Sequence, residues 1–359
     1  MKINFIIPFI FPTGGIKVII EYCNRLSDRG NDIVIYTPII SYKFNNKGIK
    51  GKFKRVKSSL GNIVKKKRNE SIIKSKASIK LIPVIDEKYI RDADIVVATA
   101  WPTAYDVDKL SNSKGKKVYL IQHYEIWSGD KKDVDGSYML NLNRIVIANW
   151  IKELLEKNFN KKSKVIYNGI SSKEFLNGEK IVDNNSIVCC MMYHKLEWKG
   201  FSDGLKAFEI VKKYNPNLKL KLFGLEDGHD IPEYAEFYKN PSRETLKKIY
   251  SESNIYIFPS RNEGWGLTIL EAMACKCAVV GTNTGALIEI GIDGENCLKS
   301  ESENIIALAN NIKRLIDNDN LLNDIANSGY RTALNFKWEN SIDEIEKYFR
   351  SLICQGEDK

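Results

Sequence analysis

The sequence predicts an α/β protein with two domains, each built on a parallel β-sheet that helices cover on both faces. The chain has 359 residues, which is more than the roughly 250–300 at which a single hydrophobic core stops growing. Short apolar segments of strand type alternate with amphipathic segments of helix type, which is the pattern of parallel sheets. A polar stretch at 171–185 follows neither pattern and is expected to link the two halves.

The first half begins with an expected strand at 2–8, a loop that contains Gly14 and Gly15, and a helix at 16–29 that Gly30 ends. A glycine directly after the last periodic residue is a common helix stop. Apolar runs predict the further strands 32–37, 79–84, 94–99, 117–122 and 144–148, and helical spacing predicts a helix at 150–158. In open parallel sheets, ligands bind at the carboxyl ends of the strands, so we expect a site there.

The second half repeats the alternation without repeating the sequence. Apolar runs predict strands at 186–192, 218–223 and 254–258. Helical periodicity predicts helices at 201–214, 243–251, 304–317 and 321–333, and a last helix at 338–352. The two halves therefore share an expected architecture only.

The most informative stretch is 258–274, Phe-Pro-Ser-Arg-Asn-Glu-Gly-Trp-Gly-Leu-Thr-Ile-Leu-Glu-Ala-Met-Ala. Pro259 ends a strand of buried type, and apolar residues return at helical spacing from Leu267 onward. Gly264 and Gly266, in the loop between them, allow the backbone to approach a ligand closely. The first N–H groups of a helix have no intrahelical partner and lie at the positive end of its dipole. The stretch therefore predicts an anion site at the carboxyl end of a strand.

Two carboxylates flank this predicted anion site. Glu263 lies in the loop, and Glu271 lies about one and a half turns into the helix, at about 1.5 Å of rise per residue. Carboxylates accept hydrogen bonds from hydroxyl groups. A phosphate between them therefore favours a nucleoside diphosphate-sugar, which is rich in hydroxyls at both ends. The alternative from spacing alone is that Glu263 is solvated and Glu271 is an ordinary helix residue.

Residues 263–271, Glu-Gly-Trp-Gly-Leu-Thr-Ile-Leu-Glu, resemble the motif of two glutamates seven residues apart in the retaining glycosyltransferases of family 4. The resemblance continues at 272–275, 278–281 and 288–290. Trp265 stands where that family more often has phenylalanine, and Lys276 stands where glycine is frequent. Neither departure changes the two glutamates of the motif.

The resemblance implies the GT-B fold, in which two Rossmann-like parallel-sheet domains face each other across a cleft. On this basis residues 1–170 are expected to form the N-terminal domain on the acceptor side. Residues 171–335 are expected to form the domain that binds the nucleotide-sugar. Residues 336–359 are expected to form a helix that returns to the N-terminal domain.

The resemblance also implies roles for the central motif. Glu271 is expected to hold the ribose hydroxyls of the donor, and Glu263 is expected to contact the sugar as a catalytic residue. The backbone between them is expected to contribute to donor binding at Gly264, Trp265, Gly266 and Leu267.

A second group of candidate residues lies at 193–200, Tyr-His-Lys-Leu-Glu-Trp-Lys-Gly. Members of the family usually place an arginine five residues before a Lys-Gly pair, and the two cations hold the donor diphosphate. Cations there are physically reasonable because charge builds on the departing phosphate. Lys199 is therefore expected to bind the diphosphate and to assist catalysis. His194 stands at the arginine position; a protonated His194, the neighbouring Lys195, or Lys199 alone are the alternatives for supplying the charge.

Two features of the first half also resemble the family. Gly14 and Gly15, directly after the first strand, resemble the glycine pair that covers the donor diphosphate. The loop is not Gly-x-Gly-x-x-Gly, so the dinucleotide fingerprint is absent. His123 ends a strand and resembles a catalytic histidine beside the donor sugar, where an imidazole can hydrogen-bond a hydroxyl.

Three Asp-x-Asp segments are candidate sites for a divalent cation. The segment 92–94 precedes a strand, 106–108 lies in an expected helix, and 133–135 lies in an expected loop. Hard cations need several converging oxygens, which none of these placements supplies. We therefore expect no metal and no other cofactor, with the nucleoside diphosphate-sugar as a co-substrate.

The formal charge is +10, and the excess is concentrated at 43–80, where Glu70 is the single acid among many lysines and arginines. Such a block can bind nucleic acid or an anionic membrane surface. Its few aromatic residues argue against stacking on single-stranded nucleic acid, so we favour the membrane and expect no nucleic-acid partner. A solvated lysine-rich surface is the alternative.

The same sequence favours a cytoplasmic protein, peripheral at the inner face of the membrane. It contains no run of about 18 apolar residues, and Pro8 breaks the first apolar segment too early for a signal peptide. The seven cysteines are odd in number and scattered, which predicts free thiols rather than a disulfide framework.

Together, the residues and the resemblance predict a retaining hexosyltransferase. It would move a hexose-type sugar from a nucleotide-sugar donor to a glycan or lipid-linked acceptor, in the synthesis of cell-surface polysaccharide or glycoconjugate. The alternative within sugar chemistry is a sugar-nucleotide epimerase or a phosphorylase of the same fold. The alternative of another class is a nucleic-acid-binding protein that uses the basic block at 43–80.

Overall fold

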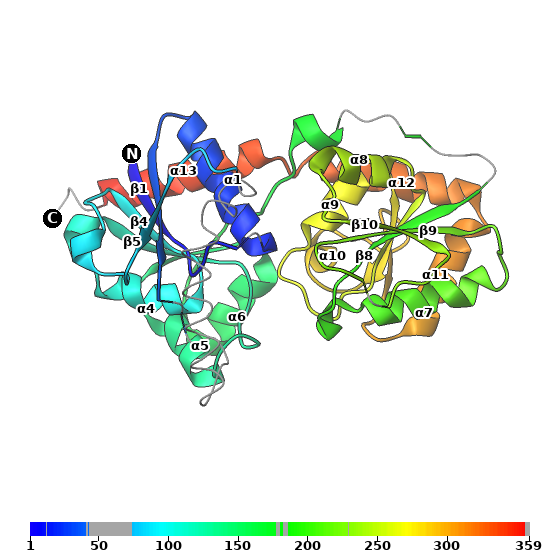
Figure 1. Cartoon of the computed structure of the whole chain (residues 1–359), viewed down its shortest axis with the longest axis horizontal. Coiled ribbons are helices and arrows are strands. Elements are labelled where there is room, and N and C mark those ends of the chain that lie inside the picture. Colours follow the sequence, from blue (N-terminus) through cyan, green and yellow to red (C-terminus); the bar gives the residue numbers. More distant parts are fainter. Residues whose placement is uncertain are drawn as a thin grey trace. The chain divides into compact units, whose positions relative to one another are not determined.

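The computed structural model describes residues 1–11, 13–40, 42, 74–176, 180–181, 186–228 and 230–355. The chain forms two compact units, which are drawn in Figure 1. Unit 1 comprises Met1–Tyr167 and Ser341–Lys359, and unit 2 comprises Asn168–Asn340. Each unit contains one parallel sheet with helices on both faces, so the predicted α/β class is confirmed.

The sheet of unit 1 has the order β3-β2-β1-β4-β5-β6-β7, and its paired strands are parallel. Its strands are Lys2–Ile6 (β1), Asp32–Pro38 (β2), Ser78–Ile82 (β3), Ile95–Ala98 (β4), Lys116–Ile121 (β5), Asn143–Val146 (β6) and Lys164–Val165 (β7). The order of the strands changes direction between β1 and β4. The carboxyl ends of such a pair leave a crevice in which ligands bind.

The helices of unit 1 are Gly14–Asp28 (α1), Trp101–Lys109 (α4), Lys131–Met139 (α5) and Asn149–Phe159 (α6). Figure 1 shows α1 on one face of the sheet, and α4, α5 and α6 on the other. Helix α1 begins where the sequence places a loop, because Thr13 caps it: the Thr13 hydroxyl accepts a hydrogen bond from the N–H of Ile16 at 3.4 Å. Gly14 and Gly15 therefore form the first turn of α1, directly after β1.

The last helix, Trp338–Cys354 (α13), begins in unit 2 and belongs to unit 1 from Ser341 onward. The Arg29 guanidinium lies 2.5 Å from a carboxylate oxygen of Asp343 and 3.3 Å from one of Glu346. Phe349 of the same helix is fully buried. These contacts hold the end of the chain against α1 within unit 1.

The sheet of unit 2 has the order β10-β9-β8-β11-β12-β13, again with parallel pairs. Its strands are Val188–Met192 (β8), Lys219–Gly224 (β9), Ala235–Lys239 (β10), Ile255–Phe258 (β11), Ala278–Thr282 (β12) and Leu298–Ser300 (β13). Here the order of the strands changes direction between β8 and β11, which are hydrogen-bonded neighbours. The carboxyl ends of β8 and β11 are therefore the place at which this sheet is expected to hold a ligand.

The helices of unit 2 are Phe201–Lys212 (α7), Arg243–Ser251 (α8), Leu267–Ala274 (α9), Ala286–Glu289 (α10), Ile305–Ile316 (α11) and Asp319–Ala333 (α12). Figure 1 shows α8, α9 and α12 on one face of the sheet, and α7 and α11 on the other. Side chains of Ser242, Asn304 and Asn318 cap α8, α11 and α12. These N-caps account for the sharp starts of three of the predicted helices.

The sequence analysis missed four strands, β7, β10, β12 and β13. The strands β7, β10 and β13 each lie at an edge of a sheet and pair with one neighbour, whereas β12 lies between β11 and β13 and is fully buried. β10 reads Ala-Glu-Phe-Tyr-Lys and is partly exposed along its length. An edge strand buries less surface than a central one, so its sequence lacks the apolar run on which the prediction depends.

Gly200 lies where the loop after β8 meets the residue that follows β11. Its φ of +66° is unfavourable for residues with a side chain, and a Cβ there would lie 1.9 Å from the carbonyl oxygen of Pro259. The two loops can therefore approach each other because residue 200 is glycine.

We expect Gly200→Ala to lower the free energy of unfolding of the protein by about 3 kcal/mol or more, through backbone strain and overlap with Pro259. Gly294→Ala is a matched control: Gly294 has a φ of +78°, but its Cβ would meet nothing within 4 Å. The control should therefore lose about 1–2 kcal/mol from strain alone. Urea titrations followed by circular dichroism measure both values. Equal losses in the two variants would contradict the close approach.

Candidate functional site

The candidate site of unit 2 lies on the two loops that leave the carboxyl ends of β8 and β11. The first loop, 193–200, ends in a short 3₁₀ turn, Glu197–Lys199, and leads into α7. The second loop, 259–266, leads into α9. Since β8 and β11 are adjacent and parallel, the two loops emerge side by side. The structure thus brings together the two candidate groups that are more than 60 residues apart in the sequence.

Lys199 and Glu263 form an ion pair between these loops. The Lys199 Nζ lies 2.5 Å from Glu263 Oε2, and the two side chains are only 13% and 14% exposed. The same Nζ lies 4.4 Å from the centroid of the Trp198 ring, within cation–π distance. The second oxygen of Glu263 accepts a hydrogen bond from the N–H of Gly264 at 3.2 Å. A cation and a carboxylate are therefore held in place at the switch point of the sheet.

Two glycines with positive φ shape the backbone around Glu263. Gly266 has a φ of +85°, and its Cβ would lie 3.2 Å from Cγ of Glu263. Gly285 has a φ of +55°, and its Cβ would lie 3.0 Å from the same side chain. Gly266 is also the N-cap of α9, and no side chain caps that helix. The N–H of Ile269 donates to the carbonyl oxygen of Gly266 at 3.0 Å, and the N–H groups of Leu267 and Thr268 precede it in the first turn. The anion site at this helix end stays a prediction from the sequence.

Glu271, the second carboxylate of the motif, lies inside unit 2 on α9. Its side chain is 7% exposed, and its Oε1 accepts a hydrogen bond from Nη1 of Arg243 at 2.7 Å. The Tyr250 hydroxyl lies 3.4 Å from Oε2. The sequence analysis missed Arg243. The available signal was a cation in the first turn of a predicted helix, where the helix dipole disfavours positive charge.

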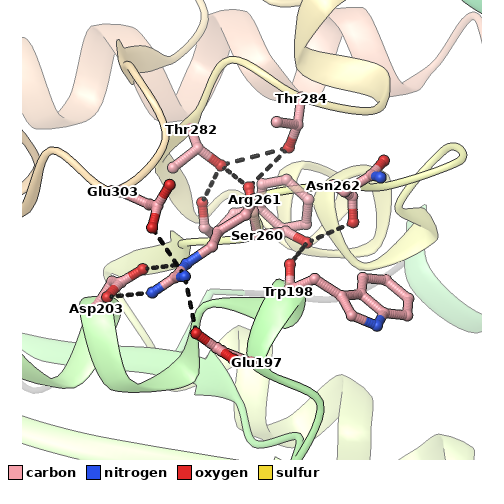
Figure 2. A network of polar contacts seen from close by, with 10 residues as sticks. Glu197, Trp198, Asp203, Ser260, Arg261, Asn262, Thr282, Thr284 and Glu303 are labelled. Carbon is pink, nitrogen blue, oxygen red and sulfur yellow. Dashed lines mark hydrogen bonds and ion pairs between the residues drawn. The ribbon is translucent and has the colours of Figure 1, made fainter. Parts of the chain in front are cut away.

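Arg261 holds the second loop in position, as Figure 2 shows. Its guanidinium pairs with both carboxylate oxygens of Asp203, at 2.8 and 3.1 Å, and with Glu303 at 2.9 Å and Glu197 at 3.3 Å. The backbone N–H of Arg261 also donates to the carbonyl oxygen of Trp198 at 2.8 Å. These contacts attach the loop that carries Glu263 to α7 and to the loop that carries Lys199.

The surroundings of His194 favour the neutral form of its imidazole. Burial lowers the pKa of its imidazole below the ordinary value of 6.5, and the nearby charge of Lys199 lowers it further. Its Nδ1 accepts a hydrogen bond from the N–H of Leu196 at 3.0 Å, which also favours the neutral ring. Lys195, the other alternative for the missing arginine, pairs with Glu226 at 3.4 Å.

The side chain of Trp265 has partners within unit 2, and the contribution to donor binding expected of this residue is that of its backbone. Its indole is only 2% exposed, and its Nε1 donates to the carbonyl oxygen of Asn168 at 3.1 Å. The ring also packs against Phe336, with centroids 5.8 Å apart. The side chain is therefore part of the interior of unit 2. A contact of Trp265 with a donor would have to come from its backbone.

The remaining candidates lie together in unit 1. Gln122 Nε2 donates to the carbonyl oxygen of Gly15 at 3.3 Å, which joins the end of β5 to the first turn of α1. In the next residue, His123, Nδ1 lies 3.0 Å from the carbonyl oxygen of Tyr124. A carbonyl accepts but does not donate, so Nδ1 carries the proton in this contact and Nε2 is the acceptor of the neutral ring.

The Asp-x-Asp segments lie apart from these residues. Asp133 is in α5 rather than in a loop, so that expectation was wrong; the helix forms on the apolar contacts of Val134 and Tyr138, which the short sequence pattern did not reveal. Asp92 pairs with Lys114 at 2.8 Å, and Asp106 accepts from the Tyr42 hydroxyl at 2.5 Å. Over the described part of the chain, no group of three or more His, Cys, Asp or Glu side chains is arranged to hold a metal ion.

Most of the basic block falls outside the described residues, which resume at residue 74. Within the described part, Lys76 pairs with Asp28 at 2.6 Å, and Lys80 lies 5.9 Å from the Tyr36 ring centroid.

None of the described helices combines the length and the apolar character needed to cross a bilayer.

Comparison with known families identifies the part of the chain that carries Lys199, Glu263 and Glu271. Residues 172–332 match the family described as glycosyl transferases group 1. The matched residues all lie in unit 2. The matched residues include both glutamates of the motif and both site loops.

Curated relatives of the chain are also described as glycosyltransferases. The capsular polysaccharide biosynthesis glycosyltransferase CapM of Staphylococcus aureus is 26% identical over 242 residues, which cover 60% of this chain and 63% of CapM. An uncharacterized glycosyltransferase of Methanocaldococcus jannaschii is 27% identical over 236 residues, which cover 62% of this chain and 65% of the relative. The chain thus spans less than two thirds of the length of these relatives.

Solved structures share the fold of the whole chain. Sucrose-phosphate synthase from Thermosynechococcus elongatus superposes with a TM-score of 0.74 at 14% identity, covering 99% of this chain and 100% of the other. HepE of Anabaena, in complex with UDP and glucose, gives a TM-score of 0.75 at 15% identity, covering 98% and 100%. These glycosyl transferase neighbours have the GT-B fold, so the predicted fold is confirmed.

We expect the His194 imidazole to titrate with a pKa below 6.5, and Lys199→Met to raise that pKa, because the repulsion between the two cationic groups is removed. NMR titration of the histidine signals measures both values, with His194→Gln assigning the resonance. Lys206→Met removes a lysine from the exposed side of α7 and should leave the pKa nearly unchanged. A His194 pKa above 6.5 in the wild-type protein would contradict this description of the site.

Proposed function

We propose that this chain is a glycosyltransferase of family 4 type, a hexosyltransferase that uses a nucleoside diphosphate-sugar and retains the configuration at the anomeric carbon. The acceptor is a glycan or a lipid-linked sugar, in the synthesis of cell-surface polysaccharide or glycoconjugate. The observation that carries the proposal is the Lys199–Glu263 ion pair at the β8–β11 switch point, beside the free N-terminus of α9. The family match of unit 2 and the description of CapM support it.

Different residues of unit 2 bind different parts of the donor in this proposal. We assign the diphosphate to Lys199 and to the backbone N–H groups at Gly264, Gly266 and Leu267. We assign the sugar hydroxyls to Glu263 and the ribose hydroxyls to Glu271. Glu263 lies in the loop before α9 and Glu271 lies about one turn into that helix. The proposed anion-binding groups lie between them in the sequence, which matches the order of groups in a nucleoside diphosphate-sugar.

Donor binding would give Lys199 and Glu263 new partners, and neither side chain would need to change its charge. Lys199 would pair with the diphosphate instead of with Glu263. The Glu263 oxygen that accepts from Lys199 in the structure could then accept hydrogen bonds from sugar hydroxyls. Charge that develops on the leaving phosphate is then stabilised by a cation already in position. In the retaining mechanism that we propose, the departing phosphate takes the proton of the acceptor hydroxyl. His194, neutral at neutral pH, is a hydrogen-bonding group near the diphosphate rather than a cation.

For unit 1 we propose that Gly14 and Gly15 cover the diphosphate and that His123 contacts the donor sugar. The His123 tautomer with the proton on Nδ1 leaves Nε2 as an acceptor for a hydroxyl group. The contact of Gln122 with Gly15 keeps these two groups together at one edge of the sheet.

We further propose that the protein works in the cytoplasm without a divalent cation. All seven cysteines are free, which suits a reducing compartment. Lys199 and the α9 N-terminus supply the positive charge that a metal supplies in other transferases. Peripheral contact with an anionic membrane through the basic block remains a proposal from the sequence.

Two glutamate substitutions test the proposal. Glu271→Ala should weaken donor binding and Glu263→Ala should lower turnover, each by about 1–3 kcal/mol or about 5- to 150-fold, because each removes a charged hydrogen-bond acceptor from a site with little solvent. Steady-state transfer and hydrolysis assays over a panel of nucleoside diphosphate-sugars, with and without a chelator, measure these effects. Glu236→Ala, on the exposed edge strand β10, is the control and should keep wild-type kinetics.

Wild-type kinetics in both Glu263→Ala and Glu271→Ala would show that the site is assigned wrongly. Interconversion of sugar nucleotides without transfer would favour the epimerase alternative, and phosphate-dependent cleavage of a glycan would favour the phosphorylase. Binding of nucleic acid at physiological salt, without any response to sugar nucleotides, would favour the nucleic-acid-binding alternative.

A further inference from the structure

Arg243 forms an ion pair with the carboxylate that we assign to the ribose. Its Nη1 lies 2.7 Å from Glu271 Oε1. The arginine side chain is 50% exposed, whereas the glutamate side chain is 7% exposed. The pair therefore joins a guanidinium that solvent can reach to a carboxylate in the interior. Removal of the arginine would leave the buried charge with the Tyr250 hydroxyl, at 3.4 Å, as its described partner.

The position of Arg243 within α8 indicates that the pair is specific. Arg243 is the first residue of α8, and the N-terminal turn of a helix disfavours a positive charge. The cap of the helix is already provided by Ser242, whose hydroxyl accepts from the N–H of Thr245 at 3.0 Å. Arg243 is thus not needed to cap α8, and the local field opposes it. Its contact with Glu271 offsets that unfavourable placement.

A second set of contacts fixes the other side of the guanidinium. The Arg243 Nε lies 3.7 Å from Glu174 Oε2, and its Cζ lies 5.6 Å from the centroid of the Phe175 ring. Both partners belong to the π-helical turn Ser172–Leu176, and Phe175 is 1% exposed. Arg243 is therefore held between this turn and Glu271, with its orientation set from two sides.

The described hydrogen bonds of Glu271 use only some of the acceptor sites of its carboxylate. An ionised carboxylate has about four lone-pair sites. Arg243 occupies one site on Oε1, and Tyr250 occupies one site on Oε2. By this count one site remains on each oxygen, which is enough to accept from two neighbouring hydroxyls of one ribose.

We propose that Arg243 is a positioning residue that orients Glu271 to accept both ribose hydroxyls, and that it thereby makes the site selective for ribonucleotides over 2′-deoxyribonucleotides. This inference rests on the proposed function and deepens it. Without Arg243 the carboxylate can rotate, so it no longer presents one oxygen to each hydroxyl. A site built to bond a hydroxyl rejects the analogue that lacks it, and the rejection depends on how well that oxygen is held.

The test is a set of dissociation constants measured by calorimetry for UDP, GDP and ADP and for their 2′-deoxy counterparts. We expect the wild-type protein to bind at least one ribonucleotide about tenfold or more tightly than its 2′-deoxy form, which corresponds to one charge-assisted hydrogen bond. Arg243→Met should weaken binding of the ribonucleotide and reduce the ratio to about 2 or less. Lys248→Met removes a cation from the exposed side of the same helix and should keep both the affinity and the ratio.

A double-mutant cycle distinguishes positioning from direct contact. If Arg243 acts through Glu271, Arg243→Met should cause no further loss of nucleotide affinity in a Glu271→Gln background. Additive losses would show that Arg243 contacts the nucleotide itself and would overturn the inference. Arg243→Lys keeps the charge but loses the planar guanidinium, so the ratio of the 2′-deoxy and ribonucleotide dissociation constants should be intermediate. This variant replaces Arg243→Met in the test if Arg243→Met does not fold.

The failure of this inference is distinguishable from the failure of the proposed function. Wild-type protein that binds none of the nucleoside diphosphates overturns the proposed function and this inference with it. Wild-type protein that binds a nucleoside diphosphate, while Arg243→Met keeps the wild-type ratio, overturns the inference alone.

Discussion

The adjacency of β8 and β11 is the constraint on which the candidate site depends. These two strands are neighbours only because the order of strands in the sheet changes direction between them. Their following loops then emerge together, so Lys199 and Glu263 come within 2.5 Å of each other. Gly200 permits the close approach of the loops, and Arg261 ties them to each other and to α7. The roles proposed for Lys199 and Glu263 follow from this arrangement.

Both carboxylates of the motif are paired with a cation before any ligand arrives. Glu263 is paired with Lys199, and Glu271 is paired with Arg243. Removing charges from water is costly, so an ion pair with little exposure adds little net stability, and we propose a second use for the cation of each pair. For Lys199 the proposed second use is the diphosphate, which requires the pair to open. For Arg243 the proposed use is orientation of Glu271, which requires the pair to stay closed. The two ion pairs thus have opposite roles in one site.

The sequence predicted the fold class and the central motif because both depend on local patterns. Apolar runs, helical spacing and the loop glycines are local, and so are the two glutamates seven residues apart. Contacts between elements could not be predicted in the same way. Arg243 and Glu271 meet because α8 packs beside α9. A cation in the first turn of a predicted helix singles out Arg243, but it does not identify Glu271 as the partner. The Trp265 indole is similar, since its partners Asn168 and Phe336 are distant in the chain. The edge strand β10 was missed because it is partly exposed along its length, and β13 was missed because three residues are too few to show a periodic pattern.

The central claim is that a nucleoside diphosphate binds with its phosphates at the N-terminus of α9, beside Lys199 and Glu263. Hydrogen–deuterium exchange, measured with and without a saturating nucleoside diphosphate, tests this claim most directly. The account predicts slower exchange of the backbone amides at 264–270 and at 196–200, because the ligand accepts from the first group and fixes the loop that carries the second. Binding of the nucleotide with protection confined to other parts of the chain would contradict it.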